Sequence, residues 1–164
     1  MDAEDARPLE SRPPTKDDLL LICRSLNEHG AKYVVIGGFA VIEHGFTRAT
    51  EDIDLLIEDS PANLDRVRAA LQVLPDKAVR EVTDSDLHEY VVVRVADEVV
   101  VDLMLRAGGV SFAAAESGIE KRVIEGVPIP FASARLLWRT KQTHREKDEL
   151  DRRFLEMKLE GKKP

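Results

Sequence analysis

The sequence has little cysteine, few aromatic residues and no long hydrophobic run. Of its 164 residues, one is cysteine and 5% are aromatic. A single thiol, Cys23, cannot form an intrachain disulfide, which excludes a disulfide-stapled domain. No apolar run approaches the ~20 residues of a membrane-spanning helix. The first residues are acidic and include proline, unlike the basic start and apolar segment of a signal peptide. We therefore expect a cytoplasmic protein without a membrane partner.

An excess of positive charge is also lacking. The net charge of −7 argues against general affinity for nucleic acids or membranes. Its distribution is uneven, because residues 1–117 carry 12 basic and 23 acidic side chains, whereas residues 118–164 carry 12 and 8. A solvated helix surface explains the basic C-terminal part most simply, and a binding face is the alternative. No pair of histidines has zinc-ligand spacing.

The apolar fraction of 43% is enough for one hydrophobic core. Residues 1–14 have the composition of a disordered tail. We expect a core over 15–132, C-terminal helices over 133–160 packed on it, and a frayed end at 161–164. Trp138 and Phe154 are expected to hold these helices to the body. The fold class predicted is α+β, with a small mixed β-sheet flanked by helices and a C-terminal helical segment.

Apolar periodicity and turn residues predict the individual elements. Thr15 should cap the first helix in a capping box with Asp18, and Gly30 should end it. Further helices are expected over 39–44, from 61 onward, and over 111–116, 133–144 and 147–159. Strands are expected over 32–36, 53–57, 90–95, 99–105 and 122–124, and 79–82 is a further short strand. The 90–95 and 99–105 strands should form a hairpin covered on both faces. Residues 127–130, which include two prolines, should be an extended link.

Two aspartates stand two residues apart in the stretch VVIGGFAVIEHGFTRATEDIDLLIE, at the start of the strand expected over 53–57. Asp52 and Asp54 should therefore project from one face, with Ile53 and Leu55 pointing into the core. Two adjacent carboxylates repel each other, and desolvation increases that cost. A hard divalent cation resolves the conflict, most often Mg²⁺, with Mn²⁺ as the alternative. Asp102, inside the apolar run VVVDLML, would complete a three-carboxylate cluster if its strand lies beside the first.

Each aspartate taken singly has an ordinary structural explanation, as a loop residue, a surface ion pair or a salt-bridged core residue. The glycines add a second signal. Gly37 and Gly38 form a turn from strand to helix, where backbone N–H groups can approach a phosphate closely.

These residues resemble a known superfamily. Val35-Ile-Gly-Gly38, then Asp52-Ile-Asp-Leu55, then a separate strand aspartate at Asp102, is similar to the hG[G/S]…Dh[D/E]h…D signature of the DNA polymerase β-like nucleotidyltransferases. The sequence from Arg139 to Lys141, followed by Arg145-Glu-Lys-Asp148-Glu-Leu-Asp151, resembles the C-terminal helices of the small bacterial AbiEii/MenT-like branch.

The resemblance implies a nucleotidyltransferase fold and transfer of a nucleoside monophosphate from an NTP, such as ATP, with release of pyrophosphate. Roles follow for the matching residues. Metal ligands would be Asp52, Asp54 and Asp102; phosphate contacts would come from Gly37, Gly38 and Lys141. Arg48 or Thr50 would contact triphosphate or acceptor, and Asp148 or Asp151 would supply the fourth motif's aspartate.

The acceptor stays open among a tRNA or other RNA, a protein hydroxyl and a small molecule. A cognate toxin or antitoxin partner is expected from the resemblance. Two alternatives to an active enzyme remain: an antitoxin-like interaction protein with the same fold, and a nucleotide-binding regulator without transfer.

Overall fold

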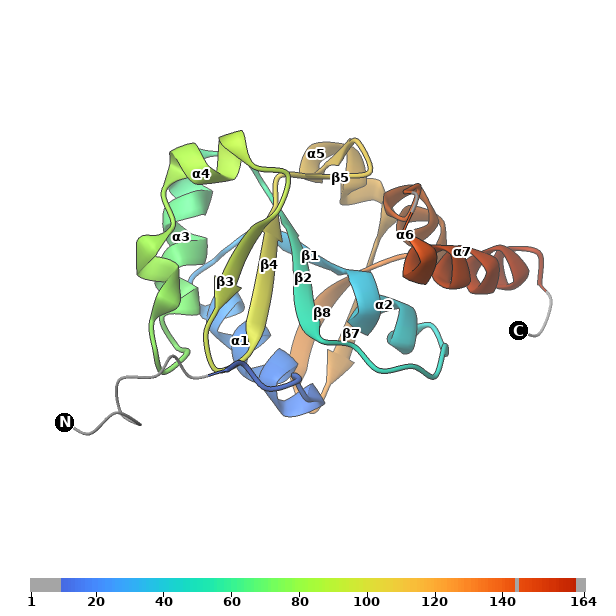
Figure 1. Ribbon diagram of the computed structural model, residues 1–164, viewed down its shortest axis with the longest axis horizontal. Helices are drawn as coiled ribbons and strands as arrows, with labels where there is room; N and C mark the ends of the chain where they lie inside the picture. The colour runs from blue at the N-terminus through green and yellow to red at the C-terminus, as the bar shows by residue number, and fades with distance from the viewer. Residues whose placement is uncertain (1–9, 144, 162–164) are drawn as a thin grey trace.

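The computed structural model describes residues 10–143 and 145–161, and these form an α+β fold built on one mixed six-stranded sheet (Figure 1). The six strands are β1 (Tyr33–Ile36), β2 (Asp52–Ile57), β3 (Val93–Ala96), β4 (Val100–Met104), β7 (Ile119–Ile124) and β8 (Val127–Ala132). A separate two-stranded ladder comprises β5 (Arg106–Ala107) and β6 (Val110–Ser111). The helices are α1 (Lys16–Glu28), α2 (Gly37–Glu43), α3 (Pro61–Leu71), α4 (Asp84–Glu89), α5 (Phe112–Ala115), α6 (Ala134–Thr140) and α7 (Glu146–Leu159), with 3₁₀ turns η1 (Ala78–Glu81) and η2 (Glu116–Gly118).

The order of strands across the sheet is β3-β4-β2-β1-β8-β7. β2 runs parallel to β4, and β1 runs parallel to β8, while the other neighbouring pairs are antiparallel. The predicted fold class, a mixed sheet with flanking and C-terminal helices, is confirmed. β2 occupies a central position between β1 and β4, so its side chains meet those of both neighbours.

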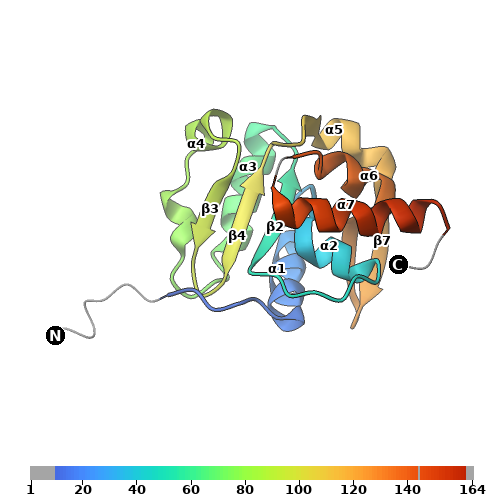
Figure 2. The same cartoon turned by 45° about the vertical axis from the view of Figure 1, so that its right-hand side comes forward.

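Helices cover the two faces of the sheet unequally. α1 and α3 pack side by side behind the sheet, on the face opposite α2 (Figure 1). α2, α6 and α7 gather over the β1 side of the other face, and β3 and β4 lie clear of them (Figure 2). This leaves the β2–β4–β3 part of that face open. No helix among the described residues has the length and apolar character to cross a bilayer.

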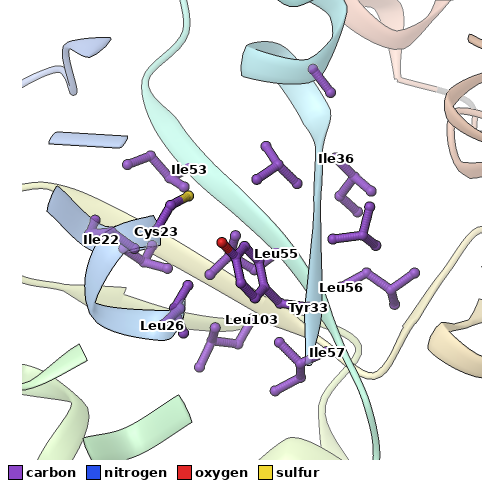
Figure 3. Close-up of a cluster of buried hydrophobic side chains, with 14 of the residues drawn as sticks. Ile22, Cys23, Leu26, Tyr33, Ile36, Ile53, Leu55, Leu56, Ile57 and Leu103 are labelled. Atoms are coloured by element: carbon purple, nitrogen blue, oxygen red, sulfur yellow. The ribbon is translucent and has the colours of Figure 1, made fainter. Parts of the chain in front are cut away.

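The main core lies between α1, α3 and the sheet. Thr15 caps α1 and forms the predicted capping box with Asp18. Ile53, Leu55 and Cys23 are fully buried and point into this core (Figure 3). Burial raises the pKa of the Cys23 thiol to about 12, so this thiol is structural and protonated at neutral pH.

Three expectations about strands were wrong. Residues 79–82 lie in and after the 3₁₀ turn η1, because the buried Asp97 carboxylate accepts from the backbone N–H groups of Asp76 and Ala78, and Lys77 adopts a φ of 50°. The 90–95 strand is shorter, since α4 and a bend precede β3. β3 is also an edge strand, and Val91, in the bend before it, is 79% exposed rather than covered on both faces.

The supposed link over 127–130 is strand β8, inside the sheet between β1 and β7. Its prolines argued against a sheet position. Pro128 and Pro130 are two residues apart, so their missing N–H groups fall on the same side of the strand. The ladder to β7 therefore runs along all six residues of β8, whereas the register with β1 is Val35 opposite Phe131.

Both C-terminal helices attach to the body: α6 packs against α2 and β8, and α7 packs along α6 and reaches the body through individual side chains. Phe154 stacks on Phe46 with ring centroids 4.9 Å apart, and the Lys158 ammonium donates to the carbonyl of His44. Trp138 instead joins α6 to α7, donating from Nε1 to Glu156. α6 ends at Thr140, earlier than expected, and residue 144 lies outside the described residues. Of the predicted N-terminal tail, 1–9 also lie outside them, while Ser11 and Arg12 contact the β3–β4 turn.

Candidate active site

Three acidic side chains meet where β2 and β4 lie side by side. The parallel register places Asp54 directly opposite Asp102, and Asp52 lies two residues before Asp54 on the same face. One carboxylate oxygen from each of the three lies within 4.8 Å of the others. The expected adjacency of the two strands is therefore correct. We call Asp52, Asp54 and Asp102 the acidic triad.

The triad lines an open cleft of about 290 Å³ on the uncovered part of the sheet. Apolar side chains such as Val91, Val92 and Met104 form one side of the cleft. Basic side chains surround the rest: Arg94, Arg106, Lys141, Arg145 and Lys147. An adjoining cavity shares Asp52, Asp54 and Lys141 and is completed by Gly38, Arg48 and Thr50, among others. The carboxylates thus sit in a cleft whose other charges are positive.

Burial and repulsion both act on Asp54. Desolvation is the main cause that raises the pKa of Asp54 to about 8, and the neighbouring charges of Asp52 and Asp102 add to it. The positive charge of Lys141 acts in the opposite direction. A divalent cation bound at the triad would relieve this repulsion and return Asp54 to its ionised form.

Gly37 and Gly38 start α2 directly beside the triad. Gly37 has a φ of +69°, and a Cβ atom on it would lie 1.9 Å from Oδ2 of Asp54. A Cβ on Gly38 would lie 2.4 Å from Oγ1 of Thr50 and 2.6 Å from Nη1 of Arg48. Only glycine fits at position 37, for reasons of both backbone conformation and space. The turn keeps backbone in contact with the acidic residues.

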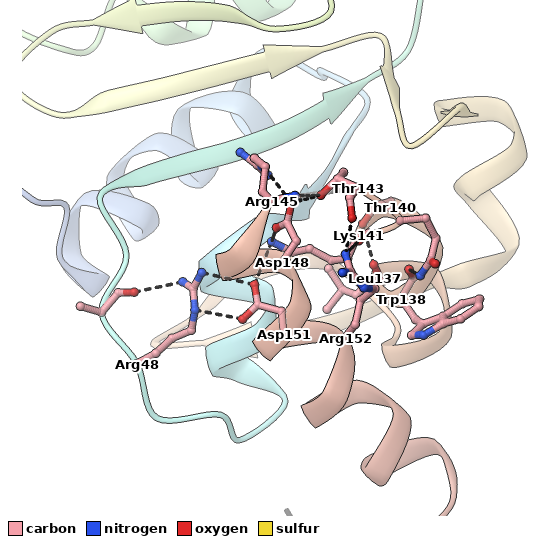
Figure 4. A network of polar contacts seen from close by, with 12 residues as sticks. Arg48, Leu137, Trp138, Thr140, Lys141, Thr143, Arg145, Asp148, Asp151 and Arg152 are labelled. Carbon is pink, nitrogen blue, oxygen red and sulfur yellow. Dashed lines mark hydrogen bonds and ion pairs between the residues drawn. The ribbon is translucent and has the colours of Figure 1, made fainter.

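Lys141 follows the last residue of α6 and is only 5% exposed. Its ammonium lies 3.1 Å from Oδ1 of Asp148 and 3.0 Å from Oδ2 of Asp151, both fully buried on α7 (Figure 4). Burial opposes ionisation of Asp148, but hydrogen bonds from Thr143 and Arg145 and the Lys141 charge lower its pKa to about 2. The position of the Lys141 ammonium therefore depends on its two ion pairs with α7.

Asp151 links this cation to the segment that precedes β2. Nε of Arg48 lies 3.1 Å from Oδ1 of Asp151, and the Arg48 side chain is only 19% exposed (Figure 4). The Thr50 hydroxyl donates to the carbonyl of Asp52. Arg48 and Thr50 therefore fix the segment that leads into β2 beside the triad.

An arginine on the edge strand also contacts the triad. Arg94 donates from Nε and Nη2 to the two carboxylate oxygens of Asp102, at 3.0 Å each. The same Nη2 lies 3.3 Å from Oδ2 of Asp52. The β3–β4 register places Arg94 opposite Asp102, as Asp102 is opposite Asp54. Asp54, Asp102 and Arg94 thus form one row across β2, β4 and β3.

Comparison with models of protein families gives a match that covers the acidic triad. Residues 19–127 match the family described as nucleotidyl transferase AbiEii toxin, Type IV TA system. This chain belongs to that family. Among curated proteins, none matches the sequence. The AbiEii match spans the two glycines and the triad, whereas Lys141 and α7 lie beyond it, so their place beside the site rests on the structure.

In this AbiEii-family chain, most residues predicted for the site do come together. Those that line the cleft or the adjoining cavity are Asp52, Asp54, Asp102, Gly37, Gly38, Arg48, Thr50 and Lys141. Asp148 and Asp151 are not among the lining residues. Both are buried behind Lys141 and contact its ammonium. Because both contact Lys141, this contact does not distinguish the two candidates for the fourth motif's aspartate.

Arg94 was missed at the level of sequence. The expected hairpin, with its turn at 96–98, pairs residue 94 with residue 100, whereas in the structure Arg94 lies opposite Asp102. Arg94 looked like an ordinary charge on a strand, and its importance follows only from the identity of its cross-strand partner.

The acidic triad of this AbiEii-family chain fits a hard divalent cation. Its donors are carboxylate oxygens, the ligands that Mg²⁺ and Mn²⁺ accept most readily. Their mutual spacing within 4.8 Å permits shared ligation, and the missing Cβ at Gly37 keeps the Asp54 oxygen accessible.

Proposed function

We propose that this protein transfers a nucleoside monophosphate from an NTP to an acceptor hydroxyl and releases pyrophosphate. The observation that supports this most strongly is the acidic triad, formed by residues from two parallel strands and placed in a cleft ringed by basic side chains. Membership of a nucleotidyltransferase family supports the same reaction class.

The bonds made and broken assign tasks to the chain's own residues. The acceptor oxygen attacks the α-phosphorus, the bond from that phosphorus to the β-phosphate bridging oxygen breaks, and pyrophosphate leaves with the electron pair. Asp102 receives or orients the proton of the acceptor hydroxyl. Lys141 offsets negative charge on the triphosphate, because it is a buried cation beside the triad.

Gly37 and Gly38 would hold the β- and γ-phosphates against the start of α2, where the Cβ-free backbone allows close approach. Arg48 and Thr50 would contact the triphosphate or the acceptor from the adjoining cavity. Asp148 and Asp151 act through Lys141 and are positioning residues.

The metal would be held by Asp52, Asp54 and Asp102, with Mg²⁺ or Mn²⁺ as the cation. When bound, it would supply Lewis-acid polarisation of the phosphoryl group and favour ionisation of the acceptor hydroxyl. The chain's contribution is to present three carboxylates on rigid strands, where their spacing does not depend on loop conformation.

The description of the family as toxins of a Type IV system supports a cognate antitoxin as a partner. It favours an enzyme over an antitoxin-like interaction protein or a regulator that only binds nucleotide. The acceptor is an RNA such as a tRNA, a protein hydroxyl or a small molecule.

The test is incubation with each α-³²P-labelled NTP, Mg²⁺, total RNA and cell lysate, followed by separation of RNA, protein and small molecules. The wild type is expected to label one class, and Asp54→Ala is expected to label none and to bind Mg-NTP much more weakly. Asp17→Asn, an exposed aspartate on α1, serves as the control. Equal Mg-NTP binding by wild type and Asp54→Ala would refute the metal assignment. Binding without any transfer would favour the regulator.

A further inference from the structure

Arg94 contacts the side of the triad that a cation would use. Both oxygens of Asp102 accept from its guanidinium at 3.0 Å, and Asp52 receives a third contact at 3.3 Å. The charge partner of the Asp102 carboxylate is therefore a side chain of the protein itself. A divalent cation bound to the same oxygens would compete directly with it.

The burial of the two partners is strongly unequal. The Arg94 side chain is 60% exposed, whereas those of Asp102 and Asp52 are 7% and 13% exposed. Arginine loses little hydration in this position and regains it easily when it leaves. Asp102 cannot do the same, because a buried carboxylate without a cationic partner is costly. Release of Asp102 by Arg94 is thus favourable only if another cation binds the Asp102 carboxylate.

We propose that Arg94 is a built-in counter-ion of the acidic triad, which stabilises the carboxylates in the metal-free protein and competes with the divalent cation. This inference rests on the proposed function, because it assumes that the triad binds metal. Arg94 extends from the edge strand β3, where its side chain can turn toward the open cleft without moving the sheet. Metal affinity is then set partly by an arginine that is not a metal ligand.

Two opposite effects follow for an arginine-to-glutamine change. Arg94→Gln should bind Mn²⁺ about tenfold more tightly, since a competing positive charge at short range is gone. The same variant should unfold at a lower temperature in chelator, because Asp102 has lost its partner. That difference should shrink or reverse in saturating Mn²⁺. A residue with only a structural role would lower stability in both conditions.

The experiment measures Mn²⁺ affinity by calorimetry and melting temperature with chelator or Mn²⁺, using the full chain. Arg106→Gln is the matched control: this exposed arginine lines the same cleft, and among the described residues its side chain has no ion pair with the triad. Arg94→Lys, which keeps the charge, should stay close to the wild type in affinity. Asp54→Asn defines Mn²⁺ binding outside the triad.

Unchanged Mn²⁺ affinity in Arg94→Gln would overturn the inference and leave the metal site standing. An equal gain in Arg106→Gln would also overturn it, because the effect would then be the general field of the cleft. If the wild type and Arg94→Gln bind no more Mn²⁺ than Asp54→Asn does, the proposed metal site fails, and the inference fails with it.

Discussion

Asp54 and Asp102 face each other directly across the parallel strands β2 and β4. Neither carboxylate can move far from the other, because each is fixed to a strand in the interior of the sheet. Their carboxylates therefore repel each other in the metal-free fold whenever both are ionised.

Replacing Asp54 with asparagine should stabilise the metal-free protein at alkaline pH. The pKa of Asp54 is raised to about 8, so the protonated form favours the folded state. That contribution is fully present below the unfolded pKa near 4 and is lost as the pH rises toward 8. At pH 8 in chelator, Asp54→Asn should exceed the wild type by at least ~1 kcal/mol in free energy of unfolding.

Urea unfolding at a series of pH values checks this expectation. The gap between the two proteins should close toward pH 4, and Mg²⁺ should stabilise only the wild type. A gap that is the same at every pH would mean that Asp54 does not titrate as described.

Removing the positive charge of the Lys141 side chain should destabilise the fold strongly. Lys141→Met leaves Asp148 and Asp151 buried without the ammonium that contacts both of them. Loss of one partner from a buried ion pair typically costs ~3–5 kcal/mol. Arg139→Met, which removes a neighbouring charge of α6, should change the free energy of unfolding by only ~0.5 kcal/mol. The double variant Lys141→Met/Asp151→Asn should recover part of the loss, and the absence of recovery would argue against this pairing.

Asp148 should contribute to stability with the opposite dependence on pH. Its folded pKa of about 2 lies below the unfolded value of 3.8, so its contribution is present above pH 4 and lost as the pH falls toward 2. Asp148→Asn should cost about 2 kcal/mol at pH 6 and progressively less below pH 4. Urea unfolding between these pH values measures it. A cost that does not decline in acid would show that packing, rather than charge, accounts for the effect.

Gly37 should tolerate substitution less well than a glycine with the same backbone conformation elsewhere. Gly37 and Gly109 both have positive φ, but a Cβ would collide with Asp54 only at Gly37 and would meet nothing within 4 Å at Gly109. Gly109→Ala should cost ~1–2 kcal/mol for the left-handed backbone alone. Gly37→Ala should cost more and also lose Mn²⁺ binding, since Asp54 must shift. Equal costs with metal binding intact would mean that the contact with Asp54 is unimportant.

Much of the fold was predictable because its signals are local. The Thr15 capping box, the helix start at residue 61 and the glycine turn each depend on residues a few positions apart. The errors arose where distant contacts overrode local preference. The prolines of β8 are accommodated within the sheet, and Asp97 draws the chain into η1 by accepting its N–H groups.

Within the candidate site, local sequence is enough to predict which residues share a face and which positions need glycine. Both are properties of a single segment, because strand side chains alternate and a positive φ is a local constraint. By contrast, the packing of the whole chain places β4 beside β2, α7 against Lys141, and Arg94 against the triad. These are contacts between distant segments. They depend on how the whole chain packs, so no short stretch of sequence contains them.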